Sequence, residues 1–306
     1  MIARPTTLDG GGGWDRTRRR AFLAGLLPAL LVLGGITVLP GLYLVLTSLT
    51  PLNLTVPDTY LDFSAPAGNY RDLAADDRFL NSVLVQARLS LASVSLQLLA
   101  GLGMALLLNT RTAFMRAIRT GFLIPMVLPP IVVAVIWKVV YTPDVSPLHR
   151  LLAAAGLPVS SLITDASTAL WAIALAESWQ WFPFTMLMVL AALQMIPDEP
   201  VEAATIDGAN RWQMFRHVLF PYIRPALVVA GLFRLIDSLK AFPLIYVLTG
   251  GGPGMATEVT NFYAFEQAFN FSYWGYASAI ATLMLAGALA LSWAVSRLGR
   301  SDHADA

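Results

Sequence analysis

Charge is scarce in this 306-residue chain, of which charged residues make up only 13%. A soluble domain carries roughly 25%, so about half of the expected charge is missing. The net charge of +1 argues against a nucleic-acid partner, which a basic surface would attract. The absence of cysteine excludes disulfides, thiolate metal sites and cysteine nucleophiles, and three scattered histidines predict no metal site.

Apolar residues take the place of charge: hydrophobic residues make up 57% of the chain, and its mean hydropathy is +0.64. Six apolar stretches are each long enough for the ~20 residues that cross a bilayer as a helix. They predict an all-α polytopic membrane domain over 22–298, between tails at 1–21 and 299–306. Prolines inside the stretches predict kinks, which are typical of helices that line a pathway. The predicted spans are 22–49, 80–108, 118–141, 167–192, 225–247 and 274–297.

The arginines are distributed unequally between the connecting segments. Thirteen lie in the tails and in the even-numbered connections, whereas only Arg71, Arg78 and Arg150 lie in the odd-numbered ones. Because cytoplasmic segments carry the excess of Lys and Arg, both termini are predicted to be cytoplasmic. Arg19-Arg20 resembles a twin-arginine signal, but the apolar run after it is far longer than that of a signal peptide. We therefore expect these arginines to anchor the first helix in a cytoplasmic membrane.

The loop at 196–225, between the fourth and fifth spans, has an unusual pattern for a connection. Asp198 is expected to cap a short helix, Gly208 to break it, and Pro221 and Pro225 to end a second helix. The second helix would place Trp212, Phe215 and Leu219 on one face. Two short helices joined by a glycine could fit a cleft on a soluble partner, or could lie against the membrane.

The same loop resembles the EAA motif of the permeases of ABC importers. The resemblance implies the type I permease architecture, with coupling helices that dock into a groove on the ATPase subunit, of which the importer has two copies. It further implies that Glu202 pairs with a basic residue there, that Gly208 sets the bend, and that the apolar face of the second helix fills the groove. The residues that carry the motif, with the second helix, are Glu202, Ala203, Ala204, Asp207, Gly208, Ala209, Trp212, Phe215, Leu219, Pro221 and Pro225.

A second signature, Leu248-Thr249-Gly250-Gly251-Gly252-Pro253, is similar to carbohydrate-type permeases, in particular to the larger permease of the maltose transporter pair. The chain lacks that subunit's extra N-terminal helices and inserted outer domain, so a sugar or polyol is expected rather than maltose itself. The resemblance implies a second homologous permease and an extracytoplasmic substrate-binding protein as partners. Because the chain has no Walker A motif, it is expected to bind no cofactor, and ATP and Mg²⁺ belong to the partner ATPase.

Ionisable residues inside the spans cost about 2.5–3.5 kcal/mol each at a helix centre, so they are candidates for function. Asp237 lies three residues from both Arg234 and Lys240 and could pair with either, or could bind substrate hydroxyls. The residues Glu177, Trp179, Gln180 and Trp181 combine polar groups with indoles that could stack on a sugar or anchor the helix. Together with Asp237, Lys240 and Tyr246 they form the predicted substrate pathway, and Arg88 and Lys138 are expected to snorkel.

Three other functions compete with a sugar importer. Arg234 and Lys240 would suit a phosphorylated polyol such as a glycerol phosphate. A secondary transporter driven by an ion gradient usually has internal repeats, and none is evident. A membrane-bound enzyme would need a histidine cluster or a nucleophile–base pair, and the sequence predicts no catalytic residue.

Overall fold

The computed structural model describes residues 11–110, 112–143, 145–156 and 161–301, and this part of the chain is all-helical apart from one isolated bridge between Asn53 and Val56. The α-helices are α1 (Gly11–Ser48), α2 (Gly68–Ala75), α3 (Asp77–Leu108), α4 (Ala113–Phe122), α5 (Ile124–Val127), α6 (Pro130–Tyr141), α7 (Pro147–Ala154), α8 (Ala169–Gln194), α9 (Asp198–Ile206), α10 (Arg211–Gln213), α11 (Phe220–Ser238), α12 (Pro243–Leu248), α13 (Thr260–Phe265) and α14 (Trp274–Ser301). A short 3-10 helix, η1 (Pro57–Thr59), and two π-helical turns, η2 (Met214–Leu219) and η3 (Glu266–Asn270), complete them.

Four helices of the described chain are long and apolar enough to cross a membrane: Phe22–Ser48, Asp77–Leu108, Arg211–Ser238 and Trp274–Ala294. Two bent pairs raise the number to six if each is one span. The all-α membrane fold is thus confirmed and is compatible with the six predicted spans. Helix α1 begins at Gly11, inside the predicted tail 1–21. Residues 1–10 and 302–306 of the two predicted tails lie outside the described residues.

Two predicted spans differ from the structure, and proline is the reason in both. The span predicted over 118–141 is broken between Val127 and Pro130, where its two halves make an angle of 97°. The span predicted over 225–247 ends at Ser238, and Pro243 begins the separate helix α12. Proline supplies no N–H donor and keeps the residue before it out of the helical conformation, so a helix tends to stop there. The short helices α6 and α12 that follow these breaks pack against each other.

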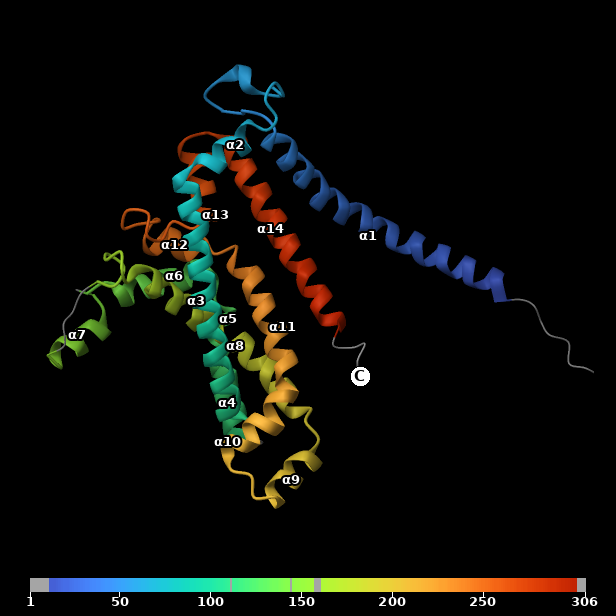
Figure 1. Cartoon of the computed structure of the whole chain (residues 1–306), viewed down its shortest axis with the longest axis vertical. Helices are drawn as coiled ribbons and strands as arrows, with labels where there is room; N and C mark the ends of the chain where they lie inside the picture. Colours follow the sequence, from blue (N-terminus) through green and yellow to red (C-terminus); the bar gives the residue numbers. More distant parts are fainter. Residues whose placement is uncertain (1–10, 111, 144, 157–160, 302–306) are drawn as a thin grey trace, which may run out of the picture.

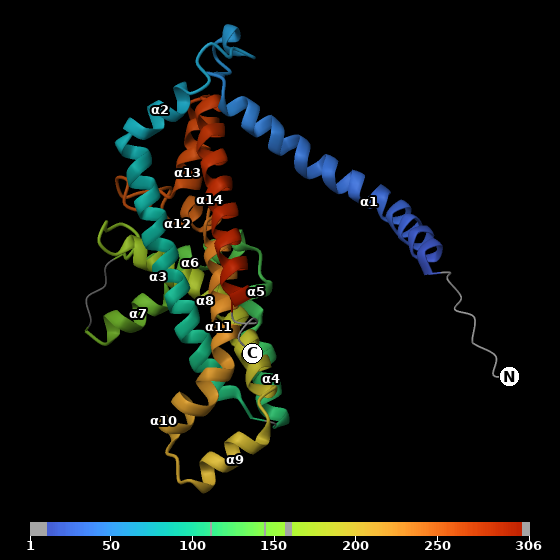
Figure 2. The ribbon, with the colours of Figure 1, turned by 45° about the vertical axis from the view of Figure 1, so that its right-hand side comes forward.

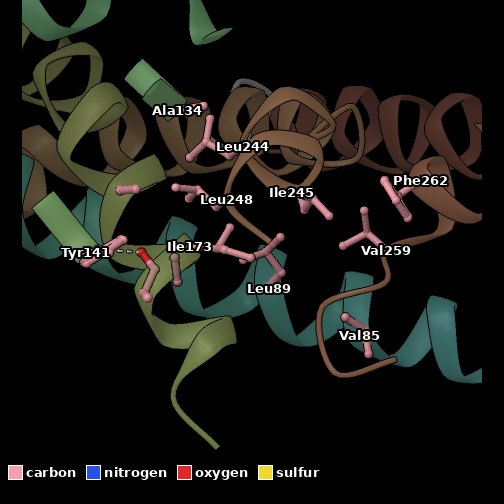
Figure 3. Packing of buried hydrophobic residues seen from close by; sticks show 13 residues of the cluster. Val85, Leu89, Ala134, Tyr141, Ile173, Leu244, Ile245, Leu248, Val259 and Phe262 are labelled. Atoms are coloured by element: carbon pink, nitrogen blue, oxygen red, sulfur yellow. Dashed lines mark hydrogen bonds between the residues drawn. The ribbon is translucent and has the colours of Figure 1, made fainter. Parts of the chain in front are cut away.

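The contact between these two short helices includes one of the charged residues in the spans. Lys138 of α6 donates a hydrogen bond of 2.8 Å to the carbonyl of Val247 in the last turn of α12. Lys138 therefore binds a helix C-terminus instead of only snorkelling. Figure 3 shows the buried cluster around this contact, in which Leu89, Ile173 and Ile245 are fully enclosed. Tyr141 donates a hydrogen bond of 2.8 Å to the carbonyl of Ala172, which joins α6 to α8.

Helices α3 and α8 form the centre of the body and pack along much of their length. A glycine allows the closest approach: a Cβ on Gly101 of α3 would lie 2.5 Å from the Cβ of Thr185 on α8. Around this point the two helices bury a second apolar cluster, to which α11 contributes Ile223. Small residues permit such close contacts between helices in a membrane.

At the end of the body near α2, the start of α3 is fixed by a carboxylate. Asp76 caps α3 by accepting from the backbone N–H of Arg78, and its other oxygen accepts from the hydroxyls of Tyr263 and Tyr276 at 2.5 Å each. Burial alone would raise the pKa of Asp76, but these hydrogen bonds outweigh it and lower the pKa below its ordinary value. Arg78 in turn makes two hydrogen bonds, of 2.7 and 2.9 Å, to the buried Glu258.

Helix α1 leaves this compact body. It contacts α14 near the end of the molecule that carries α2, and from there it diverges from the other helices (Figures 1 and 2). None of its most apolar 18-residue window is buried. The connection between α9 and α10 lies at the opposite end of the body from α2 in both views.

Candidate functional site

The loop at 196–225 contains the two predicted helices and the turn between them. Helix α9 ends at Ile206, and Gly208 follows with a φ of +77°, a left-handed conformation that glycine adopts without strain. The N–H of Ala209 donates a hydrogen bond of 2.9 Å back to the carbonyl of Ala204 and closes the turn. A Cβ on Gly208 would meet no atom within 4 Å, so only the backbone conformation favours glycine here.

The start of each helix in this loop has a distinct basis. The predicted cap of α9 is wrong: the N-cap is Pro197, with no side-chain hydrogen bond, and Asp198 is the first residue of the helix. Its carboxylate still lies near the positive end of the helix dipole. The second helix begins with a capping box, in which Asn210 accepts from the N–H of Gln213 and the Gln213 side chain accepts from the N–H of Asn210.

The sequence predicted that the second helix ends at Pro221 and Pro225, but the helix continues past both prolines. Residues 211–238 form one continuous helical segment that leads from the loop into the body. The widened turn η2 changes the hydrogen-bond register directly before Pro221: the N–H of Phe220 donates to the carbonyl of Phe215, five residues earlier. Pro221 has no N–H to donate, and the register change directly before it allows the helical hydrogen bonds to continue on its far side. The loop is thus rigidly connected to α11.

Most of the predicted coupling residues lie at the surface of this loop. Glu202, Ala203, Asp207, Gly208, Trp212 and Pro221 are exposed, whereas Ala204, Ala209, Phe215 and Leu219 are half-buried. Glu202 makes no hydrogen bond or ion pair with any residue that the structure describes, and it is exposed to solvent.

The predicted apolar face of the second helix is divided in the structure. Phe215 and Leu219 pack against the buried cluster of α3, α8 and α11, so they face the body of this chain. Trp212 stacks on Phe215, with ring centroids 5.7 Å apart, and remains 64% exposed. Ile206, which the sequence analysis did not single out, is 85% exposed beside the turn. Trp212 and Ile206 therefore form the outward apolar surface beside the Gly208 turn, and only tertiary packing could identify it.

The charged residues of the spans meet around Arg234 of α11. Its guanidinium lies 2.6 Å from Asp237 and 3.6 Å from Glu177 of α8, and it donates a hydrogen bond of 2.8 Å to Gln97 of α3. It also lies over the indole ring of Trp181, 4.2 Å from the ring centroid. We call these five residues the Arg234 cluster. They bring together three helices through one buried cation.

The Arg234 cluster is enclosed on one side and open on the other. Arg234 and Glu177 are almost fully buried, whereas the Asp237 side chain is 43% exposed and that of Lys240, 4.0 Å from Asp237, is 74% exposed. Asp237 thus lies within reach of both cations, as its spacing allows, and Arg234 is the closer partner. Three buried atoms, Nη2 of Arg234, Oε2 of Glu177 and Nε2 of Gln97, have no hydrogen-bond partner among the described residues. The cluster thus keeps unused hydrogen-bonding capacity.

The other predicted pathway residues have different surroundings. Trp179 packs edge-on against Trp137 of α6 at 5.9 Å, and Gln180 donates to the carbonyl of Leu128 at the break before α6. Tyr246 of α12 is exposed and stacks on Phe242 at 5.4 Å. The structure therefore brings Glu177, Trp181, Asp237 and Lys240 together. Trp179, Gln180 and Tyr246 have other contacts.

A row of polar residues on α3 was not among the predicted site residues. Gln86, Ser90, Ser93 and Gln97 are all buried and face α8 and α11; we call them the α3 polar stripe. Ser238 donates to Ser90 at 2.8 Å, and Ser178 donates to the carbonyl of Ser93 at 3.1 Å. Their spacings of four, three and four residues repeat with the helical period. This spacing within an apolar helix was the signal that could have revealed them.

Comparison with known proteins identifies relatives along most of the chain. Residues 97–301 match the family described as "Binding-protein-dependent transport system inner membrane component". The Trehalose/maltose transport system permease protein MalF of Thermococcus litoralis is 38% identical over 76% of this chain and 78% of its own length. The Sulfoquinovosyl glycerol transport system permease protein SmoG of Agrobacterium fabrum is 32% identical over 90% of this chain and 89% of its own.

A solved structure shows the same fold. It is a chain of a bacterial alginate ABC transporter in complex with an alginate pentasaccharide-bound periplasmic protein. The superposition covers 94% of this chain and 97% of that chain, with a TM-score of 0.79 at 20% sequence identity.

Proposed function

Since this chain belongs to the family of binding-protein-dependent transport system inner membrane components, we propose that it is the permease subunit of an ATP-driven ABC importer for an uncharged sugar or polyol. The observation that carries the proposal is the exposed α9–Gly208–α10 turn, which continues without interruption through α11 to the Arg234 cluster. The continuous helical segment at 211–238 thereby connects a surface suited to an ATPase subunit with the polar groups of the Arg234 cluster, which are suited to a substrate.

The surface for the ATPase consists of Glu202, Trp212 and Ile206 around the Gly208 turn. Two exposed apolar side chains beside an unpaired carboxylate match a groove with an apolar floor and a basic rim. Ala203 and Ala204 of α9, with Asp207 and Ala209 on either side of Gly208, add short side chains to this surface. Because the second helix runs directly into α11, a displacement of the loop is expected to move α11 as a rigid element. Two ATPase subunits would bind ATP and Mg²⁺, and this chain would bind neither.

The Arg234 cluster supports an uncharged cargo. Arg234 already faces the two carboxylates of Glu177 and Asp237, so little positive charge remains for an anionic substrate. A phosphorylated polyol would also meet the half-exposed carboxylate of Asp237, which would repel it. Hydroxyl groups, by contrast, can both donate to Asp237 and accept from Lys240, and the indole of Trp181 offers a flat apolar surface. The name of the relative MalF, a trehalose/maltose transport system permease, agrees with an uncharged carbohydrate cargo.

Helix α1 supports a second, homologous permease as the partner that completes the pathway. It has the length of a membrane span but is separated from the body for most of that length (Figures 1 and 2). Helices in a bilayer associate through close packing, and α1 offers most of its surface for such packing. The substrate pathway would lie between the two permeases, and the end that carries α2 would receive a substrate-binding protein from outside.

The proposed mechanism is alternating access in a cytoplasmic membrane, with both termini in the cytoplasm, as the arginine distribution predicts. The binding protein delivers the sugar to the outer end of the pathway. Closure of the two ATPase subunits moves the 196–225 loop and rocks α11 against α3 and α8, and the Arg234 cluster is then exposed to one side or the other.

Reconstitution in proteoliposomes tests this function. The permease is purified with the subunits that accompany it, and ATP hydrolysis is measured while binding protein and candidate ligands are added outside. We expect stimulation by an uncharged sugar or polyol and none by its phosphate ester. Stimulation by the phosphate ester alone would refute the uncharged cargo, and uptake without ATP, driven by an ion gradient, would refute the importer.

The substitution Glu202→Lys tests the coupling surface separately. Because Glu202 is exposed and has no partner among the described residues, reversing its charge is expected to leave the fold intact. ATP hydrolysis should lose its dependence on the binding protein, while insertion and melting temperature stay unchanged. Normal uptake by this variant would contradict the proposed contact with the ATPase.

A further inference from the structure

Arg88 on α3 is a charged residue in a predicted span that the transport function does not use. Three other cations of these spans, Arg234, Lys138 and Lys240, each lie near a carboxylate or carbonyl oxygen. For Arg88 the described residues provide no hydrogen bond or ion pair, and its side chain is exposed. A buried or membrane-embedded charge is normally paired, so a group outside this chain is expected to face it.

The position of Arg88 along α3 gives its depth in the bilayer. From Leu89 to Leu108, the end of the helix, no residue is charged. Twenty residues at 1.5 Å each make about 30 Å, the thickness of the hydrocarbon core. Arg88 therefore lies at the boundary between hydrocarbon and headgroups on the side of the membrane that carries α2. This is also where the expected snorkelling would direct its guanidinium.

A cavity of about 640 Å³ lies beside Arg88, between α3 and the start of α8. Toward the membrane core its wall is apolar and includes Leu91 and Leu96. Its lining also includes the hydroxyl-bearing Ser167 and, from the start of α8, the indole of Trp171, which is 61% exposed. Tryptophan is enriched at this depth in membranes because its ring is amphipathic. A cation above an apolar slot is thus placed at the level of lipid phosphates.

The cavity is separate from the proposed cargo pathway. Arg88, Leu91 and Ser95 lie on one face of α3, whereas the α3 polar stripe lies on the opposite face. Residues two apart on a helix differ by about 200° in direction, and Arg88 is two positions from both Gln86 and Ser90. A sugar at the Arg234 cluster would therefore not reach Arg88.

We propose that this cavity binds a phospholipid from the leaflet on the side of α2. The lipid phosphate pairs with the Arg88 guanidinium, and one acyl chain follows the apolar wall past Leu91 and Leu96. Charge complementarity selects a phosphate group, and the apolar wall selects a lipid over free inorganic phosphate. The indole of Trp171 covers the glycerol level and joins the start of α8 to α3 through the lipid.

Native mass spectrometry of the permease, purified with its accompanying subunits from membranes, tests this site. We expect Arg88→Ala to retain at least five-fold less phospholipid than the unchanged protein, and Arg88→Lys to retain an intermediate amount. Arg71→Ala is the matched control, because Arg71 is an exposed arginine on α2 that does not line the cavity. Leu91→Trp, which keeps the charge but fills the slot, should also reduce the bound lipid.

Three results would overturn the proposal. The first is equal lipid retention by Arg88→Ala and Arg71→Ala. The second is a loss of a protein subunit from Arg88→Ala with lipid unchanged, which would assign Arg88 to a carboxylate of a neighbouring subunit. The third is normal lipid in Leu91→Trp, together with protection by inorganic phosphate alone against modification of Arg88 by phenylglyoxal, which would assign the site to a free anion. If Arg88→Ala fails to assemble, Arg88→Lys and Leu91→Trp decide the question.

Discussion

A substitution series at Gly208 gives the sharpest prediction for the 196–225 loop. Gly208 has a φ of +77°, and a Cβ there would meet nothing within 4 Å, so the cost of a side chain comes from the backbone alone. An L-residue in the left-handed conformation costs roughly 1–2 kcal/mol, which is about a 5–30-fold change in the population of the turn. Asparagine tolerates this conformation, whereas a β-branched residue is an outlier in it. Gly208→Asn should therefore remain coupled, and Gly208→Val should lose coupling by about that factor.

The assay is ATP hydrolysis stimulated by the binding protein in proteoliposomes, with sugar uptake measured in parallel. Gly156→Val is the matched control, because Gly156 also has a left-handed φ, of +70°, with no atom within 4 Å of a Cβ, but lies after α7. It should carry the same backbone strain without affecting coupling. Equal activity of Gly208→Asn and Gly208→Val would refute the argument from backbone conformation. An equal loss in Gly156→Val would show that the effect is not specific to the loop.

Two further predictions concern groups that hold the fold together. Arg234→Met should destabilise the protein by about 3–5 kcal/mol, because it leaves the buried carboxylate of Glu177 uncompensated. Adding Glu177→Gln should restore part of the melting temperature measured in detergent, and the absence of any recovery would contradict the pairing. For Asp76, the folded pKa lies below the ordinary value of 3.8, so its contribution is complete above that pH and is lost as the pH falls through the folded pKa. The melting temperature should thus drop more between pH 5 and pH 3 in the unchanged protein than in Asp76→Asn, which keeps the helix cap, and parallel curves would exclude this role.

The breaks in the spans illustrate what the sequence could not specify. Pro183, Pro129 and Pro243 all predicted kinks, yet α8 runs through Pro183 while the chain breaks before α6 and α12. A proline removes the same N–H donor in each case. Whether the helix continues depends on which neighbours satisfy the freed carbonyls, and such neighbours come from distant parts of the chain. Gln180, which donates from α8 to the carbonyl of Leu128 at the break before α6, is one such neighbour.

The two candidate sites differ in how far local sequence predicts them. The Gly208 turn is determined by contacts within a few residues, so the motif and its spacing located it correctly. The outward surface of that loop was not predictable, because Phe215 and Leu219 face the body while Ile206 faces solvent. In the Arg234 cluster only the pairing with Asp237 is local; Glu177 and Gln97 reach Arg234 from other helices.

The sequence by itself determined that this protein is a helical membrane protein. Its long runs without charge favour a bilayer, and there a helix pairs the backbone N–H and C=O groups of each run with one another. It also determined the position of the Gly208 turn, since a glycine and its neighbours fix a turn through local backbone energetics. Tertiary structure alone decided that α1 separates from the body, that the fifth span is divided, and that Arg234 joins three helices. These features depend on contacts between residues far apart in the chain, and the local pattern carries no information on which helices meet.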